Sequence, residues 1–309
     1  MKLARLFGAR GPRREVPAGM ATIPGSTFWM GSDDHYVEER PRRQVSVAPF
    51  HIDLTPVTNA QFQTFVEATG YRTLAEQAPD ASLYPDADPA LMKAGSSVFT
   101  GTRGPVPLND PLQWWAYRPG ARWSRPEGPA SHIADRPNHP VVHVAYADAL
   151  AYAAWCGKRL ATEAEWECAA RGGLDRATYA WGDVLAPAGQ IMANYWTGEF
   201  PWRRDRVGDW TRTSPVATFP ANGFGLFDMI GNVWEWTADD YFVSADSGVV
   251  KRCCTSGNGS GSPFATKVLK GGSHLCAESY CQRYRPAARH PQTEDTSTSH
   301  IGFRCVQDA

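Results

Sequence analysis

The chain has 309 residues, and 31 Lys and Arg against 32 Asp and Glu give it a formal net charge of −1. This balance gives no basis for a nucleic-acid partner or an anionic membrane surface. Gly and Pro supply about one residue in six, yet 12% of the residues are aromatic, which excludes a disordered chain and indicates a packed fold rich in loops and turns.

The order of motifs along the chain narrows the fold class further. No segment repeats with a period of about 20 to 50 residues, which excludes β-propellers and solenoids. The longest apolar stretch, 141–155, contains His143 and Asp148 and is too short to cross a membrane. Residues 1–19 lack the apolar core of a signal peptide, so we expect a disordered or over-long tail there, one domain over 20–309, and a cytoplasmic protein.

The first predicted elements are strands followed by a helix. Residues 22–31 alternate around a glycine turn, as an opening strand or hairpin does, and 44–48 alternate again. Thr58 is then a good N-cap with Gln61 as its capping-box partner. The apolar spacing that follows predicts a helix that ends at Gly70.

The middle of the chain differs in composition. Residues 78–140 hold eleven prolines and several tryptophans, which favours a long ordered excursion pinned by aromatic side chains over the alternative of a disordered linker. A second helix is predicted over 147–156, and a third begins after Thr162 and ends at Gly172. Three short helices among many turns and short strands indicate a single α+β domain.

Cys276 and Cys281 form the first candidate site. Four residues separate them, which is wrong for one helical face, but on an irregular loop their sulfurs can converge. Arg283 and Arg285 lie close in sequence and favour the thiolate form. Two thiolates suit Cu(I) or a redox disulfide, and two buried apolar thiols are the alternative.

Asp228 to Glu235 form a second candidate, because carboxylates at both ends flank the bend at Gly231 and Asn232. Carboxylate and carbonyl oxygens are ligands of Ca²⁺. The alternative is a plain Gly-Asn turn between two strands.

Two other pairs of residues are of metal-binding types but are weaker candidates for a functional site. His139 and His143 have a metal-ligand spacing, but no third ligand follows and Pro140 lies between them, so we interpret them as structural. Cys253 and Cys254 are adjacent on a Ser/Gly-rich segment, where thiols are favoured over a strained vicinal disulfide.

Several segments together resemble the formylglycine-generating enzymes, or sulfatase-modifying factors, from Thr22 to Val306. They are PGSTFWMGS (24–32), PVTNAQFQTFV (56–66), KRLATEAEWECAARGG (158–173), GNVWEW (231–236), GGSHLCAESYCQRYRPAAR (271–289) and GFRC (302–305). The pattern GGS-x-x-C-x-x-x-x-C-x-R-Y-R is the most specific, because non-catalytic relatives lack its cysteine pair. The resemblance implies a compact, loop-rich α+β domain distantly related to C-type lectins.

The resemblance also implies an activity. Such enzymes oxidise the cysteine of a Cys-x-Pro-x-Arg motif in a client sulfatase to Cα-formylglycine, using O₂, Cu(I) and an external reductant such as a thiol. Cys276 and Cys281 would hold the copper, with the client cysteine as third sulfur ligand. Trp234, Ser273 and Tyr280 match positions that line the cleft, in which the client is expected to bind as an extended peptide.

Structural calcium is a further implication of the resemblance. One site would use Asp228, Gly231, Val233 and Glu235, and the other would use Asn194, Tyr195, Gly208 and Trp210. At the second site the family pattern Asp-Gly-aromatic reads Gly208-Asp209-Trp210 here, so the carboxylate is either shifted by one position or replaced by Asp205. Secreted relatives pair the GFRC cysteine with one at the position of Ala153; Cys305 lacks that partner, which supports a reduced, cytoplasmic protein.

Two other functions compete with the copper oxidase. One is a peptide-binding module of the same fold without turnover, against which the cysteine pair argues. The other is a sulfoxide synthase, which needs an iron site of the form His-x-x-x-His-x-Glu and an extra helical domain. Val144 and Ala145 follow His143 instead, so this alternative is not favoured.

Overall fold

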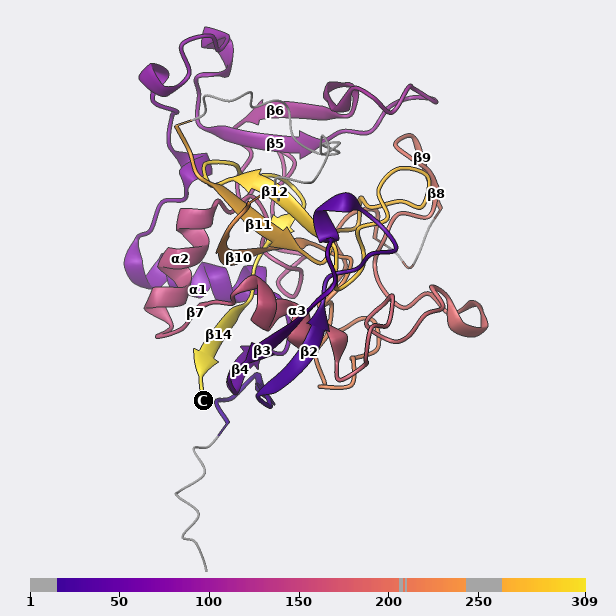
Figure 1. Ribbon diagram of the computed structural model, residues 1–309. Coiled ribbons are helices and arrows are strands. Elements are labelled where there is room, and N and C mark those ends of the chain that lie inside the picture. The colour runs from indigo at the N-terminus through magenta and orange to yellow at the C-terminus, as the bar shows by residue number, and fades with distance from the viewer. Residues whose placement is uncertain (1–15, 206–207, 209, 243–262) are drawn as a thin grey trace, which may run out of the picture.

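Two four-stranded sheets and three α-helices organise the part of the chain that the structure describes, residues 16–205, 208, 210–242 and 263–309 of a computed structural model (Figure 1). The first sheet has the order β1-β4-β14-β7 and is antiparallel throughout. Its strands are β1 (Met20–Ile23), β4 (Phe50–Asp53), β14 (Cys305–Asp308) and β7 (Arg159–Leu160). The sheet therefore joins both ends of the domain.

The second sheet has the order β12-β11-β10-β13 and lies at the centre of the molecule (Figure 1). Its strands are β10 (Trp234–Asp240), β11 (Thr266–Lys270), β12 (Arg289–Thr293) and β13 (Ile301–Gly302). β10 and β13 run parallel, whereas the other pairs are antiparallel. The segment between β11 and β12 carries the two cysteines of the candidate site.

Three two-stranded ribbons complete the strands of the described residues. They pair β2 (Ser26–Met30) with β3 (Arg43–Val47), β5 (Gly95–Phe99) with β6 (Trp115–Pro119), and β8 (Gly198–Glu199) with β9 (Arg203–Arg204). Residues 22–31 thus form parts of two strands, but not one hairpin, because β1 pairs with β4 and β2 with β3. The alternating pattern predicted the strands but not which strand each of them pairs with.

The helices begin and end where local hydrogen bonding predicts. They are α1 (Asn59–Thr69), α2 (Tyr146–Trp155) and α3 (Glu163–Arg171). Thr58 and Thr162 each form the predicted capping box, and Gly70 and Gly172 adopt the left-handed conformation that ends a helix. Six short 3-10 turns add to them: η1 (Val37–Glu39), η2 (Leu74–Glu76), η3 (Ala81–Leu83), η4 (Pro89–Leu91), η5 (Pro111–Gln113) and η6 (Pro187–Gly189).

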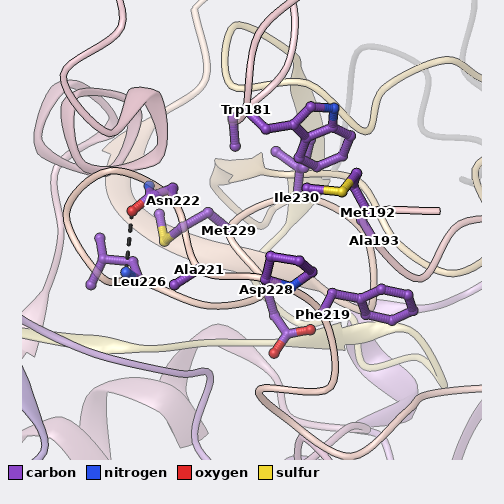
Figure 2. Close-up of a pocket in the computed structure, with 12 residues that line it drawn as sticks. Trp181, Met192, Ala193, Phe219, Ala221, Asn222, Leu226, Asp228, Met229 and Ile230 are labelled. Atoms are coloured by element: carbon purple, nitrogen blue, oxygen red, sulfur yellow. Dashed lines mark hydrogen bonds between the residues drawn. The ribbon is translucent and has the colours of Figure 1, made fainter. Parts of the chain in front are cut away.

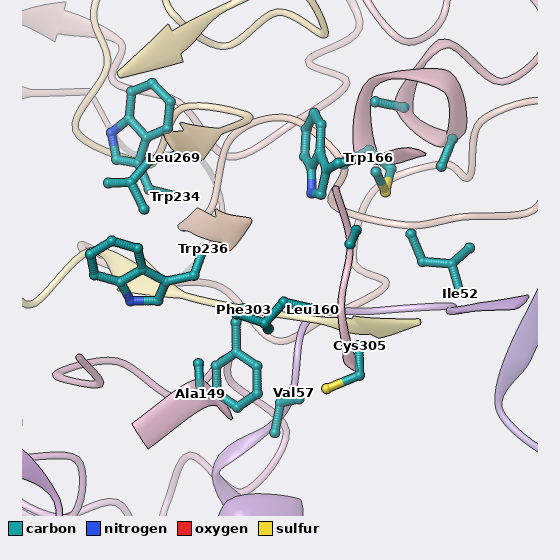
Figure 3. Packing of buried hydrophobic residues seen from close by; sticks show 14 of the residues in the cluster. Ile52, Val57, Ala149, Leu160, Trp166, Trp234, Trp236, Leu269, Phe303 and Cys305 are labelled. Atoms are coloured by element: carbon teal, nitrogen blue, oxygen red, sulfur yellow. The ribbon is translucent and has the colours of Figure 1, made fainter. Parts of the chain in front are cut away.

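The core lies between the central sheet, α3 and the first sheet. Trp166 of α3 and Trp234 and Trp236 of β10 are buried there with Phe303 and Cys305 (Figure 3). A second, smaller cluster gathers aromatic residues of the excursion and of the chain after Ala193: Phe99, Trp114, Trp196 and Phe200, with Leu275 and Ala277. The excursion is therefore ordered and anchored by aromatic packing, as predicted.

These features confirm a single α+β domain with few helices and short strands. None of the helices within the described residues is long and apolar enough to cross a membrane. Residues 1–15 and the pair Cys253-Cys254 lie outside the described residues, so the predictions for them stay predictions.

Candidate functional site

Two consecutive glycines at the end of β11 start the loop that carries the cysteines. Gly271 and Gly272 both have positive φ, at 91° and 71°, where L side chains are strained. A Cβ at Gly272 would lie only 2.6 Å from the carbonyl oxygen of Arg283. The glycine thus allows the two ends of the segment 272–283 to touch, which closes the cysteine loop on itself.

This closed loop brings the two predicted sulfurs together. Sγ of Cys276 and Sγ of Cys281 are 3.5 Å apart, well beyond the roughly 2 Å of a disulfide bond. Both residues are 1% exposed. The backbone N–H of Ser273 donates to Sγ of Cys276 at 3.4 Å. The sulfurs therefore lie as a close, buried pair with a donor beside one of them.

A buried arginine lies beside the other sulfur. Nη1 of Arg283 is 3.7 Å from Sγ of Cys281, and the rest of the guanidinium is hydrogen-bonded to Glu38, with Nε at 3.2 Å from Oε1. The ring of Tyr36 lies 3.9 Å from the guanidinium carbon, a cation–π contact. Positive charge is thus held at Cys281, where it favours thiolate over thiol.

The segment 36–39 forms further contacts with the segment that carries the cysteines. Arg285 pairs with Glu39, with Nη1 at 2.8 Å from Oε2, and both side chains are buried. The hydroxyl of Tyr36 accepts from the backbone N–H of Gln282 at 3.1 Å. Sequence reasoning identified the arginines but missed Tyr36, Glu38 and Glu39, because about 245 residues separate the partners and no local pattern links them.

Tyr280 lies at the edge of the smaller aromatic cluster. It stacks on Phe200 with ring centroids 4.6 Å apart and meets Trp114 edge-on at 5.5 Å. It is half-buried, and its neighbours Glu278 and Ser279 are exposed. Of the three predicted substrate contacts, Tyr280 is the one that reaches the surface.

Ser273 and Trp234 are both enclosed by protein. The Ser273 hydroxyl accepts from the N–H of Leu275 at 3.2 Å, and its side chain is fully buried. Trp234 is 0% exposed and stacks on His290 with ring centroids 5.5 Å apart. Ser273 adjoins the cysteine pair through its backbone, whereas the contacts of Trp234 are those of a core residue and do not support its predicted role in binding substrate.

The two acidic residues of the first predicted calcium site have other partners. Arg304 donates to both oxygens of Glu235 at 2.8 Å, and Nε1 of Trp166 donates to Oε2 at 2.7 Å. Glu235 is therefore the buried counter-ion of Arg304, and both of its carboxylate oxygens accept hydrogen bonds. Gly231 and Val233 precede it in the bend before β10, and the N–H of Gly231 donates to the carbonyl of Gly271 at 2.9 Å.

Asp228, the other acidic residue of that site, has its own partners. Its oxygens accept from the N–H of Ala217 at 2.8 Å and from Nδ2 of Asn232 at 3.4 Å. Burial raises its pKa to about 6. Figure 2 shows Asp228 in a pocket lined mainly by apolar side chains, among them Phe219 and Met229. A pocket with one carboxylate does not fit the several hard oxygen ligands of Ca²⁺.

At the second predicted calcium site, an arginine side chain is hydrogen-bonded to two of the predicted ligands. Oδ1 of Asn194 accepts from Nη2 of Arg204 at 2.6 Å, and the carbonyl of Tyr195 accepts from the same nitrogen at 3.3 Å. Gly208 and Trp210 could each offer a metal only a backbone carbonyl oxygen, and Asp209 between them lies outside the described residues. The four predicted ligands therefore include no carboxylate, and two of their oxygens are hydrogen-bonded to Arg204, which does not fit calcium at the described residues.

The remaining candidates are structural, as predicted. His143 is fully buried between Oγ of Ser96 at 2.7 Å and the carbonyl of Pro126 at 2.8 Å, and burial lowers its pKa to about 4. Nδ1 of His139 contacts the Thr213 hydroxyl at 3.0 Å. Cys305 is fully buried and forms no disulfide with the other described cysteines.

Copper is the ion that the donor set of the cysteine pair fits. Two close sulfurs with N–H donors beside them are soft ligands, which favour Cu(I) over harder ions. Within the described residues, no group of three or more His, Cys, Asp or Glu side chains is placed to hold a metal. A metal ion held by these two sulfurs would take any further ligand from outside the described residues.

The chain matches known proteins over nearly its whole length. The family model of the sulfatase-modifying factor enzyme 1-like domain matches residues 8–309. The formylglycine-generating enzyme of Mycobacterium tuberculosis is 55% identical over 94% of this chain and 97% of its own. That of Thermomonospora curvata is 48% identical over 96% and 97%, and that of Bos taurus is 42% identical over 96% and 77%.

Solved structures share the fold. PvdO from Pseudomonas aeruginosa superimposes with a TM-score of 0.60 at 23% identity, covering 94% of each chain. CarF does so with a TM-score of 0.52 at 22% identity, covering 96% of this chain and 100% of its own. Because family model, curated relatives and the GGS-x-x-C-x-x-x-x-C motif agree along the chain, we conclude that this protein belongs to the family of the formylglycine-generating enzymes.

Proposed function

We propose that this protein is a copper-dependent oxidase that converts the cysteine of a Cys-x-Pro-x-Arg motif in a client sulfatase to Cα-formylglycine. The observation that carries the proposal is the buried pair of sulfurs 3.5 Å apart, in the segment most specific to the family. The names of its relatives support the conversion itself. Copper, O₂, an external reductant and a cytoplasmic location belong to the proposal.

The reaction balances with one O₂ and two electrons from the reductant. O₂ accepts four electrons, of which the oxidation of the client CH₂–SH group to an aldehyde supplies two and a thiol reductant the other two. Both oxygen atoms of O₂ leave as water with the protons taken up, hydrolysis of the oxidised client carbon by one water gives the aldehyde, and the client sulfur leaves as hydrogen sulfide. Bound Cu(I) would supply the one-electron chemistry with O₂ that the protein side chains lack.

The chain's own residues hold and orient the reacting groups. Cys276 and Cys281 would bind the metal, and the Ser273 N–H and the Arg283 guanidinium stabilise their negative charge. Burial of both sulfurs excludes water from their surroundings. Tyr280, half-buried beside Cys281, would contact an extended client peptide.

A peptide assay tests the proposal directly. Incubation with a Cys-x-Pro-x-Arg peptide, Cu(I) and a thiol should lower the peptide mass by about 18 units, the difference between Cys and formylglycine. Cys276→Ser and Cys281→Ser should each abolish the product, because a hydroxyl is a poor ligand of Cu(I). Cys168→Ser is the matched control, since Cys168 is also buried but contacts the hydroxyl of Ser26.

The same assay decides against the second candidate. A relative from Bos taurus with 39% identity is named an inactive formylglycine-generating enzyme, so the fold also occurs in a protein without turnover. A wild-type chain that binds the peptide and leaves its mass unchanged at every copper concentration would be a peptide-binding module, and the oxidase proposal would be wrong.

A further inference from the structure

Arg204, on β9, is a cation held by neutral oxygens. Its Nη2 donates to Oδ1 of Asn194 and to the carbonyl of Tyr195, at 2.6 and 3.3 Å, and its Nη1 donates to the carbonyl of Thr211 at 2.9 Å. We call these three oxygens the oxygen shell. Among the described residues no carboxylate forms an ion pair with Arg204, whereas the neighbouring Arg203 pairs with Glu199 at 2.9 Å.

The charge of Arg204 is present at neutral pH. Burial lowers its pKa to about 10, and the positive charge of Arg212 acts in the same direction. The guanidinium therefore stays protonated although its surroundings disfavour charge. Amide and carbonyl oxygens must offset that penalty, and such oxygens also bind Ca²⁺ in proteins.

The orientation of Asn194 is fixed independently of Arg204. Its Nδ2 donates to the carbonyl of Arg212 at 3.0 Å and to Oγ of Ser214 at 3.2 Å. With the amide nitrogen engaged on that side, Oδ1 faces the guanidinium. The oxygen shell is thus built by the backbone and by a fixed amide.

We propose that Arg204 is the permanent cation of this oxygen shell and that it takes the place of the calcium ion that the family resemblance implies at Asn194 and Tyr195. A calcium ion on the same two oxygens would lie a few ångströms from the guanidinium, where like charges repel. The sequence agrees at one position, because Gly208 stands where the family pattern has Asp; Asp209 lies outside the described residues.

The replacement ties β9 to the cysteine loop without a metal. The guanidinium carbon of Arg204 lies 5.5 Å from the centre of the Trp196 ring. The backbone N–H of Trp196 in turn donates to the carbonyl of Cys276 at 2.9 Å. Arg204 therefore stabilises the chain next to Cys276 through packing and hydrogen bonds that no chelator can remove.

Counting bound calcium tests the proposal without reference to activity. The full chain, equilibrated with millimolar calcium and freed of excess by gel filtration, is analysed for calcium per chain. We expect no calcium that depends on the oxygen shell, so that any ion found is retained by Asn194→Ala. A calcium ion that Asp228→Asn retains and Asn194→Ala removes would overturn the proposal. Should Asn194→Ala not fold, calcium retained by Asp228→Asn alone would overturn it.

A matched pair of arginine variants tests the structural role of the cation in EGTA. Arg204→Met keeps most of the side-chain volume but leaves the oxygen shell without a cation, so we expect the melting temperature to fall by several degrees. Arg203→Met, one residue earlier, removes an exposed arginine whose ion pair is solvated, and we expect little change. Equal melting temperatures for the two variants in EGTA would overturn the proposal.

Discussion

Single residues of the segment 36–39 decide how the cysteine segment is held. Glu38 and Glu39 each pair with a buried arginine, and all four side chains are at most 3% exposed. Breaking a buried ion pair from one side leaves an uncompensated charge. The two pairs differ in one respect, because only the partner of Glu38 also contacts a cysteine sulfur.

That difference yields a prediction for two matched variants. Glu38→Gln and Glu39→Gln should each lower the free energy of unfolding in urea by about 3 kcal/mol. Only Glu38→Gln should also weaken Cu(I) binding, measured by competition with a Cu(I) chelator, because Arg283 is then no longer fixed beside Cys281. An equal loss of Cu(I) affinity in both variants would contradict a specific role for Arg283.

At the scale of residues, the cysteine pair and the arginines after it could be predicted from the sequence, but the residues that hold those arginines could not. Cys276, Cys281 and the arginines after them stand in one short motif, so their proximity could be predicted. Glu38 could not, because its role depends on packing between segments 245 residues apart. Glu235 shows the converse, since its motif predicted a metal and the fold supplies Arg304 instead.

At the scale of elements, the helices follow from local sequence and the sheets do not. The Thr162 hydroxyl accepts from the N–H of Glu165 at 3.2 Å, and the Glu165 carboxylate accepts from the N–H of Thr162 at 2.8 Å. Both partners are three residues apart and can be identified in the sequence. By contrast, β14 pairs with β4 across some 250 residues, which no local signal specifies.

The cap of α3 gives the second prediction. Thr162→Ala removes the acceptor for the N–H of Glu165, so we expect the free energy of unfolding to fall by about 1 kcal/mol. Thr64→Ala on the exposed face of α1 is the control, because Thr64 donates only to the carbonyl of Ala60 within its own helix. Urea denaturation of both variants measures the effect, and a larger loss for Thr64→Ala would contradict this view of the cap.

At the scale of the whole molecule, pH acts on stability through a buried carboxyl group that joins α2 to the chain after α1. Asp148 accepts from the N–H groups of Ala145 and Leu74 and from the hydroxyl of Tyr71, at 2.8 to 3.0 Å. Burial nevertheless raises its pKa from 3.8 to about 6. The folded chain therefore keeps this proton at a pH where the unfolded chain has released it.

The direction of the pH effect on stability follows from the higher pKa of Asp148 in the folded chain. Below about pH 4 the group is protonated in both states, and as pH rises to about 6 the unfolded state is favoured by up to about 3 kcal/mol. Asp148→Asn removes this dependence, so its stability relative to wild type should improve between pH 4 and 7. Urea denaturation at several pH values measures it. Asp86→Asn, at an exposed position, should show no such trend.

The place of β14 has a consequence for how the protein is made. The strand is formed by the last residues of the chain, Cys305–Asp308, yet it lies inside the first sheet between β4 and β7. When both cysteines have been translated, the residues of β14 are still missing. The first sheet then has no strand between β4 and β7. The first sheet can therefore close only after the residues of β14 have been synthesised, which is later than both cysteines of the candidate site.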